Sequence, residues 1–518
     1  MDGELPDRLL AAVYDSSTTK SKKGRSHNNN NFRQMTREGK HMSHQKRGKE
    51  SSNPNDCNHV HHTFKMKRAS AFLSGSGAMK ELTSNRPKVL IVGSGITGAI
   101  CSHQIRSLLP HVQLNVADMA RGPGGRMSTT RHNVRETEIK ANTGAQYASC
   151  CSEEIRKMLM DVCGQDPPLH IKEIETPMER SLHFRLSEPE AYTHFEIPGG
   201  TNNLVKQFLY AGRPDVVSFQ TRLAKLWRNP ENNKIVPQFD LRRKNSPKKS
   251  VDSSLTLEYD AVVLALPPKD IIKFFQNQNG NHRPRHDPQS QADLHRHFNQ
   301  SNLNTAPLPD CLPLVFDEKL NTQLRKVQYI GQYSLALWFD NQQGLEFVQR
   351  TFEAFNTERN AHPVLDAVFM QQQGHVLVAQ STETLWKQYG LWVSAGGGRG
   401  GGRQKRGRSA GNTLNQIKGG GREEVRAILT KALEELAGGT PIPQVSHAKL
   451  LNWRTCQVNV PLVVPQGDSV ATTTENGRVI LTGDWCIESS FEGCYRAGEA
   501  AAKLVQKQLM TENTRRVA

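Results

Sequence analysis

The sequence predicts an α/β fold with a Rossmann-like domain. Three observations predict it. Short apolar segments typical of buried strands alternate with segments of helical periodicity, a glycine-rich turn joins the first strand to the first helix, and low-complexity segments interrupt the rest. Only 36% of the 518 residues are hydrophobic and 6% are aromatic. This apolar content is low for such a length, so part of the chain is expected to bury little.

The predicted elements follow one another in the order that a Rossmann-like domain requires. Lys88–Val92 is expected to form a buried strand, Ile96–Leu109 a helix and Val112–Val116 a second strand. Residues 261–265 form another wholly apolar segment. Further strands are expected at Phe219–Leu226, Val327–Asp340 and Val479–Thr482, and helices at Glu423–Leu436 and Ala497–Leu509.

The positive charge is concentrated in two low-complexity segments. Of the net charge of +17, residues 1–87 contribute +8 and residues 391–421 contribute +6, which leaves +3 for the rest. Residues 1–87 are rich in Asn, Ser, Lys and His without periodicity, so we expect a disordered basic arm. Residues 278–305 and 391–421 are predicted to be insertions. A basic nucleic-acid-binding surface over the folded part is thereby excluded as the main interpretation.

The turn after the first strand has the spacing of a dinucleotide-binding site. In Gly93-Ser94-Gly95-Ile96-Thr97-Gly98, the first glycine permits the tight turn, the second lets a pyrophosphate approach the backbone, and the third allows helix and strand to pack closely. Asp118 follows Gly98 by 20 residues, where a carboxylate accepts hydrogen bonds from ribose hydroxyls. The alternative is a glycine-rich turn without a ligand.

A second glycine-rich segment and a series of later motifs narrow the interpretation. Gly124-Gly125-Arg126-Met127 follows the acidic residue, and Asn142–Tyr147 contains Gly-Ala-Gln-Tyr. In this order the motifs resemble those of the FAD-dependent amine oxidase superfamily, and in particular its renalase branch. The remaining motifs are Ile197–Gly200, Tyr259–Pro267, Tyr333–Leu337, Trp453–Val458, Leu481–Asp484 and Phe491–Cys494.

This resemblance implies non-covalently bound FAD between two domains. The FAD-binding domain would comprise residues 88–165, 195–275 and 443–518, and a mixed-sheet substrate domain would comprise residues 166–194 and 306–442. The residues that the resemblance places at the cofactor are Gly93, Ser94, Gly95, Ile96, Thr97, Gly98, Asp118, Gly124, Gly125, Arg126, Met127, Leu223, Gly483, Asp484, Glu492 and Gly493.

The resemblance also implies an activity, the oxidation of 2- or 6-dihydro-NAD(P) to NAD(P)+ with O2 reduced to H2O2. Gln146, Tyr333 and Trp453 are candidates for positions beside the flavin, although each could be an ordinary structural residue. No catalytic residue is assigned, because hydride transfer to a flavin depends more on alignment than on a side-chain base.

Two alternative functions stay open. Val327–Asp340 lacks the lysine that amine oxidases keep in this strand, which weakens amine oxidation without removing it. The alternative from another class is an FAD-containing scaffold that binds RNA through residues 396–408, where five Arg and Lys residues lie among glycines without interleaved aromatic residues.

The sequence favours a cytoplasmic protein without a membrane span or a metal. No stretch of 18 apolar residues is present, and Asp2 and Glu4 occupy the region where a signal peptide is basic. Nine cysteines without regular spacing are typical of reduced thiols. Basic runs at 21–25 and 404–408 leave a nuclear location as the alternative. His59, His61 and His62 lie in the predicted arm, where no rigid scaffold would fix a metal site.

Overall fold

The computed structural model describes residues 86–134, 136–174, 192–241, 257–278, 312–314, 318–352, 362–395, 420–462, 471–472 and 477–517. All of them belong to one compact unit, Met66–Ala518. Residues 1–85 of the predicted arm lie outside the described residues. Residues 279–305 and 396–419 of the predicted insertions also lie outside the described residues. The RNA-binding alternative concerns residues 396–408, so the structure does not describe that segment.

A six-stranded sheet forms the Rossmann-like part of the fold. Its order is β17-β18-β11-β1-β2-β8, and the strands are parallel except at the β17 edge. The strands are β1 (Lys88–Val92), β2 (Gln113–Ala117), β8 (Val216–Ser218), β11 (Ala261–Leu264), β17 (Ala471–Thr472) and β18 (Val479–Leu481). From β1 the chain proceeds outward on one side to β2 and β8, and on the other side to β11 and β18. Parallel sheets bind ligands at such a switch point, beyond the carboxyl ends of the strands.

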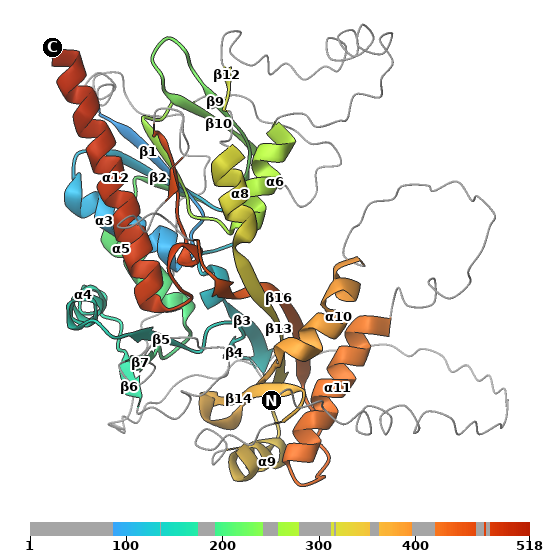
Figure 1. Cartoon of the computed structure of the whole chain (residues 1–518). Helices are drawn as coiled ribbons and strands as arrows, with labels where there is room; N and C mark the ends of the chain where they lie inside the picture. The colour runs from blue at the N-terminus through green and yellow to red at the C-terminus, as the bar shows by residue number, and fades with distance from the viewer. Residues whose placement is uncertain are drawn as a thin grey trace, which may run out of the picture. The chain divides into compact units, whose positions relative to one another are not determined.

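Helices cover both faces of this sheet, which explains why β1 and β11 are almost wholly apolar. Val89 and Ile91 point into a core shared with α3 (Ile96–Leu108), α5 (Asn202–Gly212) and α12 (Phe491–Val517). These three helices lie side by side in Figure 1. Leu90 and Val92 point to the other core, against α6 (Pro268–Gln278) and α8 (Glu318–Lys326).

A four-stranded antiparallel sheet forms the second part, in the order β14-β15-β13-β16. Its strands are β13 (Gln328–Trp338), β14 (Leu365–Gln371), β15 (Val376–Ser381) and β16 (His447–Val460). One face packs on α9 (Gln342–Phe352), α10 (Glu383–Ala395) and α11 (Gly420–Leu436). The other packs on the hairpin of β3 (Thr129–Val134) and β4 (Thr137–Asn142).

Two three-stranded sheets and short helices complete the described fold. One sheet has the order β5-β7-β6 and the other β10-β9-β12. These strands are β5 (Tyr147–Cys150), β6 (Lys172–Ile174), β7 (Thr193–Glu196), β9 (Thr221–Arg228), β10 (Ile235–Leu241) and β12 (Leu312–Pro313). The helices are α4 (Glu153–Cys163) and the single turns η3 (Gly125–Met127), η6 (Gln372–Gly374) and η7 (Asp484–Cys486). The α/β fold class with a Rossmann-like core is therefore confirmed.

The structure corrects several predicted boundaries. α12 begins at Phe491 rather than at Ala497. The predicted insertion 391–421 is partly helical, because α10 ends within it at Ala395 and α11 begins within it at Gly420. β16 was assigned to the FAD-binding segments, but its hydrogen bonds join it to β13 in the antiparallel sheet. The substrate sheet was predicted as mixed, whereas all its described strand pairs are antiparallel. No described helix is long and apolar enough to span a bilayer.

Candidate functional site

A cavity of about 1290 Å³ lies at the carboxyl ends of the parallel strands and extends to the antiparallel sheet. Pockets for small ligands usually measure about 300–1,000 Å³, so this cavity has room for a dinucleotide together with a second molecule. The predicted cofactor residues that line it are Gly93, Gly95, Ile96, Thr97, Gly98, Asp118, Gly124, Gly125, Arg126, Met127, Leu223, Gly483 and Asp484. Ser94, Glu492 and Gly493 are not among the lining residues.

The turn between β1 and α3 leaves an open space in front of Gly95. A Cβ atom built on Gly95 would have no neighbour nearer than Gly125 Cα at 4.0 Å, whereas one on Gly98 would overlap Gly93 O. Gly98 therefore serves the packing of the turn, and Gly95 borders the cavity. The N-terminus of α3 has no side-chain cap and no acidic residue in its first turn. Uncapped N–H groups at a helix N-terminus bind phosphate oxygens, so this turn fits the diphosphate of a dinucleotide.

Asp118 is held at the end of β2 by hydrogen bonds that fix both carboxylate oxygens. Oδ2 accepts hydrogen bonds from Ser94 N at 2.6 Å and Ser94 Oγ at 2.7 Å, and Oδ1 accepts one from Ala120 N at 2.7 Å. Ser94 is fully buried behind the carboxylate. The role of Ser94 is thus to orient Asp118, which lines the cavity where the spacing places an adenosine ribose.

Arg126 and Asp484 form an ion pair in the cavity wall. Arg126 Nη2 lies 2.5 Å from Asp484 Oδ1, and the Asp484 side chain is only 3% exposed. Tyr329 Oη also donates to Asp484 Oδ1, at 3.1 Å, and Ser489 Oγ donates to Oδ2. Burial alone would lower the pKa of Arg126, but the negative charge of Asp484 raises that pKa above its ordinary value. The pair therefore holds the permanently charged guanidinium of Arg126 in the cavity wall.

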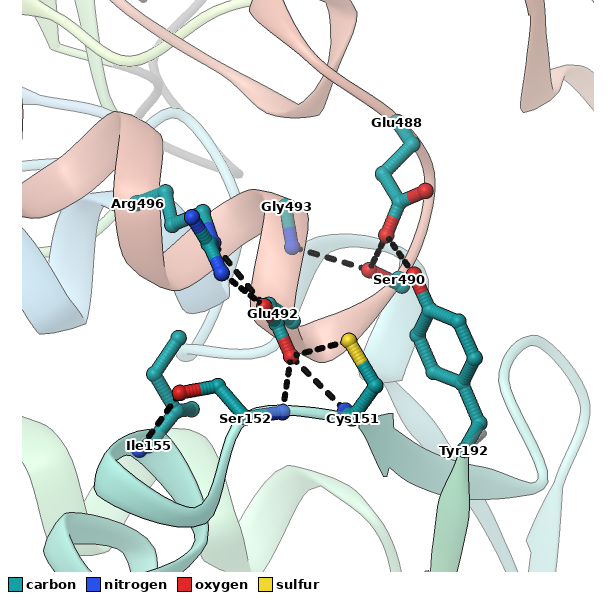
Figure 2. A network of polar contacts seen from close by, with 9 residues as sticks. All are labelled: Cys151, Ser152, Ile155, Tyr192, Glu488, Ser490, Glu492, Gly493 and Arg496. Atoms are coloured by element: carbon teal, nitrogen blue, oxygen red, sulfur yellow. Dashed lines mark hydrogen bonds and ion pairs between the residues drawn. The ribbon is translucent and has the colours of Figure 1, made fainter. Parts of the chain in front are cut away.

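The Glu492 side chain does not line the cavity, although its neighbours Ser490 and Phe491 do. Figure 2 shows that its carboxylate joins the start of α12 to the turn between β5 and α4. Oε2 accepts hydrogen bonds from Cys151 N at 2.7 Å and Ser152 N at 2.9 Å, and Oε1 accepts from Arg496. Burial would raise the pKa of Glu492, but these hydrogen bonds lower it below its ordinary value. Gly493 N donates to Ser490 Oγ at 2.8 Å, which caps α12.

The turn Asn142–Gln146 joins the cofactor segment to the antiparallel sheet. Ala145 N donates to Arg126 O at 3.0 Å. The carbonyl groups of the turn accept hydrogen bonds from three strands of the sheet: Gln371 Nε2 of β14 to Asn142 O at 3.1 Å, Gln380 Nε2 of β15 to Gly144 O at 3.0 Å, and Trp453 Nε1 of β16 to Thr143 O at 2.7 Å. The structure thus fixes this turn from both sides of the cavity.

Two of the three candidates for positions beside the flavin line the cavity, and the third does not. Gln146 and Trp453 line it. The Gln146 amide is already engaged, because Nε2 donates to Asn142 O and Gly144 O and Oε1 accepts from Gln371. The prediction for Tyr333 was wrong: its side chain is fully buried in the core between the sheet and the helices α9, α10 and α11, and it does not line the cavity.

Sequence reasoning missed the part of the wall contributed by β14 and β15. Asp366, Phe369 and Gln380 line the cavity, although their segment carried no recognised motif. The available signal was the alternation in β15, which puts Gln380 on the same face as the buried Val376 and Val378. Among the described residues, no group of three or more His, Cys, Asp or Glu is placed to bind a metal ion. His59, His61 and His62 lie outside those residues.

Comparisons with known proteins identify relatives of the chain. A family model described as the NAD(P)-binding Rossmann-like domain matches residues 91–162. Renalase from Mus musculus is 23% identical over 267 residues, which cover 49% of this chain and 58% of that renalase. The solved structure of cyclohexylamine oxidase from Brevibacterium oxydans IH-35A is 11% identical with a TM-score of 0.45, over 82% of this chain and 100% of that one. The chain thus spans somewhat more than half of that renalase, and this similarity supports the resemblance predicted from its motifs.

Proposed function

We propose that the chain is an FAD-dependent oxidoreductase that oxidises 2- or 6-dihydro-NAD(P) to NAD(P)+ and reduces O2 to H2O2. The observation that carries this proposal is one cavity lined at one end by the glycine-rich turn and Asp118, and at the other by Gln146, Gln380 and Trp453. Similarity to renalase supports the choice of substrate class.

The residues that would hold FAD follow the cavity wall. The open space at Gly95, with the uncapped N-terminus of α3, would take the diphosphate, and Asp118 would accept from a ribose. Gly124–Met127 and Gly483 would border the middle of the cofactor, and Leu223 would contact the adenine. When bound, FAD supplies a hydride acceptor that O2 can reoxidise.

The chain's own contribution is to bind and orient the two molecules and to exclude water. Phe369 and Trp453 offer aromatic surface for a flat ring, and the Arg126–Asp484 pair supplies a fixed charge in the wall. Gln146, locked by its hydrogen bonds, keeps the turn in place and transfers no proton. We also propose a cytoplasmic location, because Cys101, Cys163 and Cys456 are free thiols.

Amine oxidation is the second candidate, and one observation favours it. Asp366 and Glu383 line the cavity and could attract an ammonium group. Asp366 accepts a hydrogen bond from Gln332 Nε2 at 3.3 Å, and Glu383 Oε1 lies 2.9 Å from Lys387 Nζ, so both carboxylates already have partners. β13 contains no lysine. Oxidation of a dihydronicotinamide therefore accounts better for the cavity.

Anaerobic bleaching of the flavin absorbance tests the proposal. The FAD-loaded protein is mixed with 2- or 6-dihydro-NAD(P), with ordinary 4-dihydro NADH or with a simple monoamine, and free FAD is the control. We expect rapid bleaching only by the 2- or 6-dihydro isomers, and release of H2O2 when air is readmitted. Rapid bleaching by the monoamine with no response to these isomers would instead establish the amine oxidase alternative.

A further inference from the structure

Gln380, near the end of β15, is a cavity residue to which neither the sequence motifs nor the proposed FAD contacts give a role. Its strand neighbours on the same face, Val376 and Val378, are buried against the β3–β4 hairpin. Gln380 lies one step further along this face and lines the cavity. A polar side chain that continues an apolar face into a cavity is placed to contact a ligand.

Hydrogen bonds fix the orientation of this amide. Gln380 Nε2 donates to Gly144 O at 3.0 Å. Gly144 packs closely on Arg126 O, so closely that a Cβ atom on it would overlap that oxygen, and the carbonyl groups just before it accept hydrogen bonds from Trp453 and Gln371. The second N–H of the Gln380 amide and its Oε1 have no partner among the described residues. One donor and one acceptor on a fixed amide are therefore left for a ligand.

The walls around Gln380 are suited to a flat ring. Ala367 is paired with Gln380 in the sheet, and Phe369 and Trp453 also line this end of the cavity. A ring held against these side chains would present its substituent to the amide at the rim. A primary carboxamide is the substituent that matches one donor and one acceptor reciprocally, whereas an amine or a ketone satisfies only part of the pair.

We propose that Gln380 binds the carboxamide group of the substrate's nicotinamide ring and thereby determines specificity for nicotinamide dinucleotides. This inference rests on the proposed function. Gln371 has a different role: it is hydrogen-bonded to Asn142 and Gln146 and so positions the turn, and it does not line the cavity. Gln380 is accordingly the specificity residue, and Gln371 is a positioning residue.

The test compares the binding of NAD+ with that of its 3-acetylpyridine analogue, in which a methyl ketone replaces the carboxamide. Dissociation constants are measured by calorimetry on the FAD-loaded protein. For the wild-type protein we expect NAD+ to bind about 10- to 100-fold more tightly, the range of a paired buried amide. Gln380→Leu should reduce this ratio to about one.

Two matched variants separate recognition from structure. Gln371→Leu should lower the melting temperature yet keep the NAD+ preference, and Gln388→Leu, at an exposed position of α10, should change neither. Gln380→Met, which keeps the side-chain length, replaces Gln380→Leu if that variant retains no FAD. An unchanged ratio in the Gln380 variants, or an equal loss of preference in Gln371→Leu, would overturn the assignment.

The same protein distinguishes this failure from failure of the proposed function. If the wild-type protein oxidises 2- or 6-dihydro-NAD(P) but the Gln380 variants keep the preference, only the role of Gln380 is wrong. If the wild-type protein neither oxidises these isomers nor binds NAD+, the proposed function and the role of Gln380 both fail.

Discussion

Two glycines of the β1–α3 turn, three residues apart, have opposite physical reasons for being glycine. Gly98 has no room for a side chain, because its Cβ would overlap Gly93 O, and Gly95 has room but borders the space assigned to a diphosphate. Gly95 is extended, with φ −71° and ψ 178°, so alanine fits its backbone conformation. Motif matching treats the two positions alike, and the structure separates them.

Alanine substitutions should therefore produce two different phenotypes. Gly95→Ala should leave the apoprotein as stable as the wild-type apoprotein but weaken FAD binding, and so lose the roughly 2.7 kcal/mol that FAD at 100 times its Kd contributes. Gly98→Ala should destabilise the apoprotein itself by about 1–3 kcal/mol, because the added methyl group overpacks the turn. Melting temperatures with and without FAD measure both effects. A Gly95→Ala protein that holds FAD normally would remove the diphosphate from this position.

At the scale of elements, the Glu492 carboxylate joins α12 to the β5–α4 turn and so supports part of the cavity wall from outside. Ala148 and Ser149 of β5 line the cavity, and the next residues of the turn are held by Glu492. The resemblance places Glu492 near the flavin, and sequence alone could not show that its side chain points to another element. Glu492 is only 3% exposed, so its hydrogen bonds should contribute measurably to stability.

Glu492→Gln should lower the free energy of unfolding by about 1–3 kcal/mol at neutral pH. The folded-state pKa of Glu492 lies below its ordinary value of 4.5, so its contribution is complete above that value and is lost as the pH falls through the folded-state pKa. The stability difference between wild type and variant should thus shrink as the pH is lowered below about 4.5. Urea unfolding from pH 3 to 7 measures it, with Glu154→Gln, at an exposed position of α4, as the control. A difference that is constant with pH would show that the carboxylate charge is not what stabilises the turn.

The sequence predicted the parallel strands well and the antiparallel partners poorly, for a physical reason. A parallel strand buried on both faces is a nearly continuous run of apolar residues, so β1 and β11 could be recognised locally. The partner of an antiparallel strand depends on tertiary contacts: β16 pairs with β13, more than a hundred residues earlier, and nothing within His447–Val460 specifies this. The same holds for Tyr333: its strand was predicted correctly, but the sequence did not show which face of the sheet its side chain would occupy.

At the scale of the whole molecule, the turn Asn142–Gln146 lines the cavity and connects the Rossmann-like part of the fold to the antiparallel sheet. Its backbone is bonded to Arg126 on the side of the parallel sheet and to side chains of three strands of the antiparallel sheet. Binding of the cofactor and binding of the substrate are therefore both expected to stabilise the conformation of this turn. The residues assigned to substrate contact in this region, Gln380 and Trp453, do not ionise, which bears on how the rate should depend on pH.

We predict that the rate of anaerobic flavin bleaching by 2- or 6-dihydro-NAD(P) is nearly constant from about pH 6 to 9. Hydride loss from a ring that becomes a stable cation needs no base. The thiols of Cys456 and Cys494 also line the cavity, and burial raises the pKa of each to about 12. Raising an acid's pKa keeps it neutral to higher pH, so both thiols stay protonated throughout the range. Stopped-flow absorbance at saturating substrate measures the rate. A strong pH dependence that His362→Gln abolishes would instead assign a proton transfer to His362, a residue of the cavity wall.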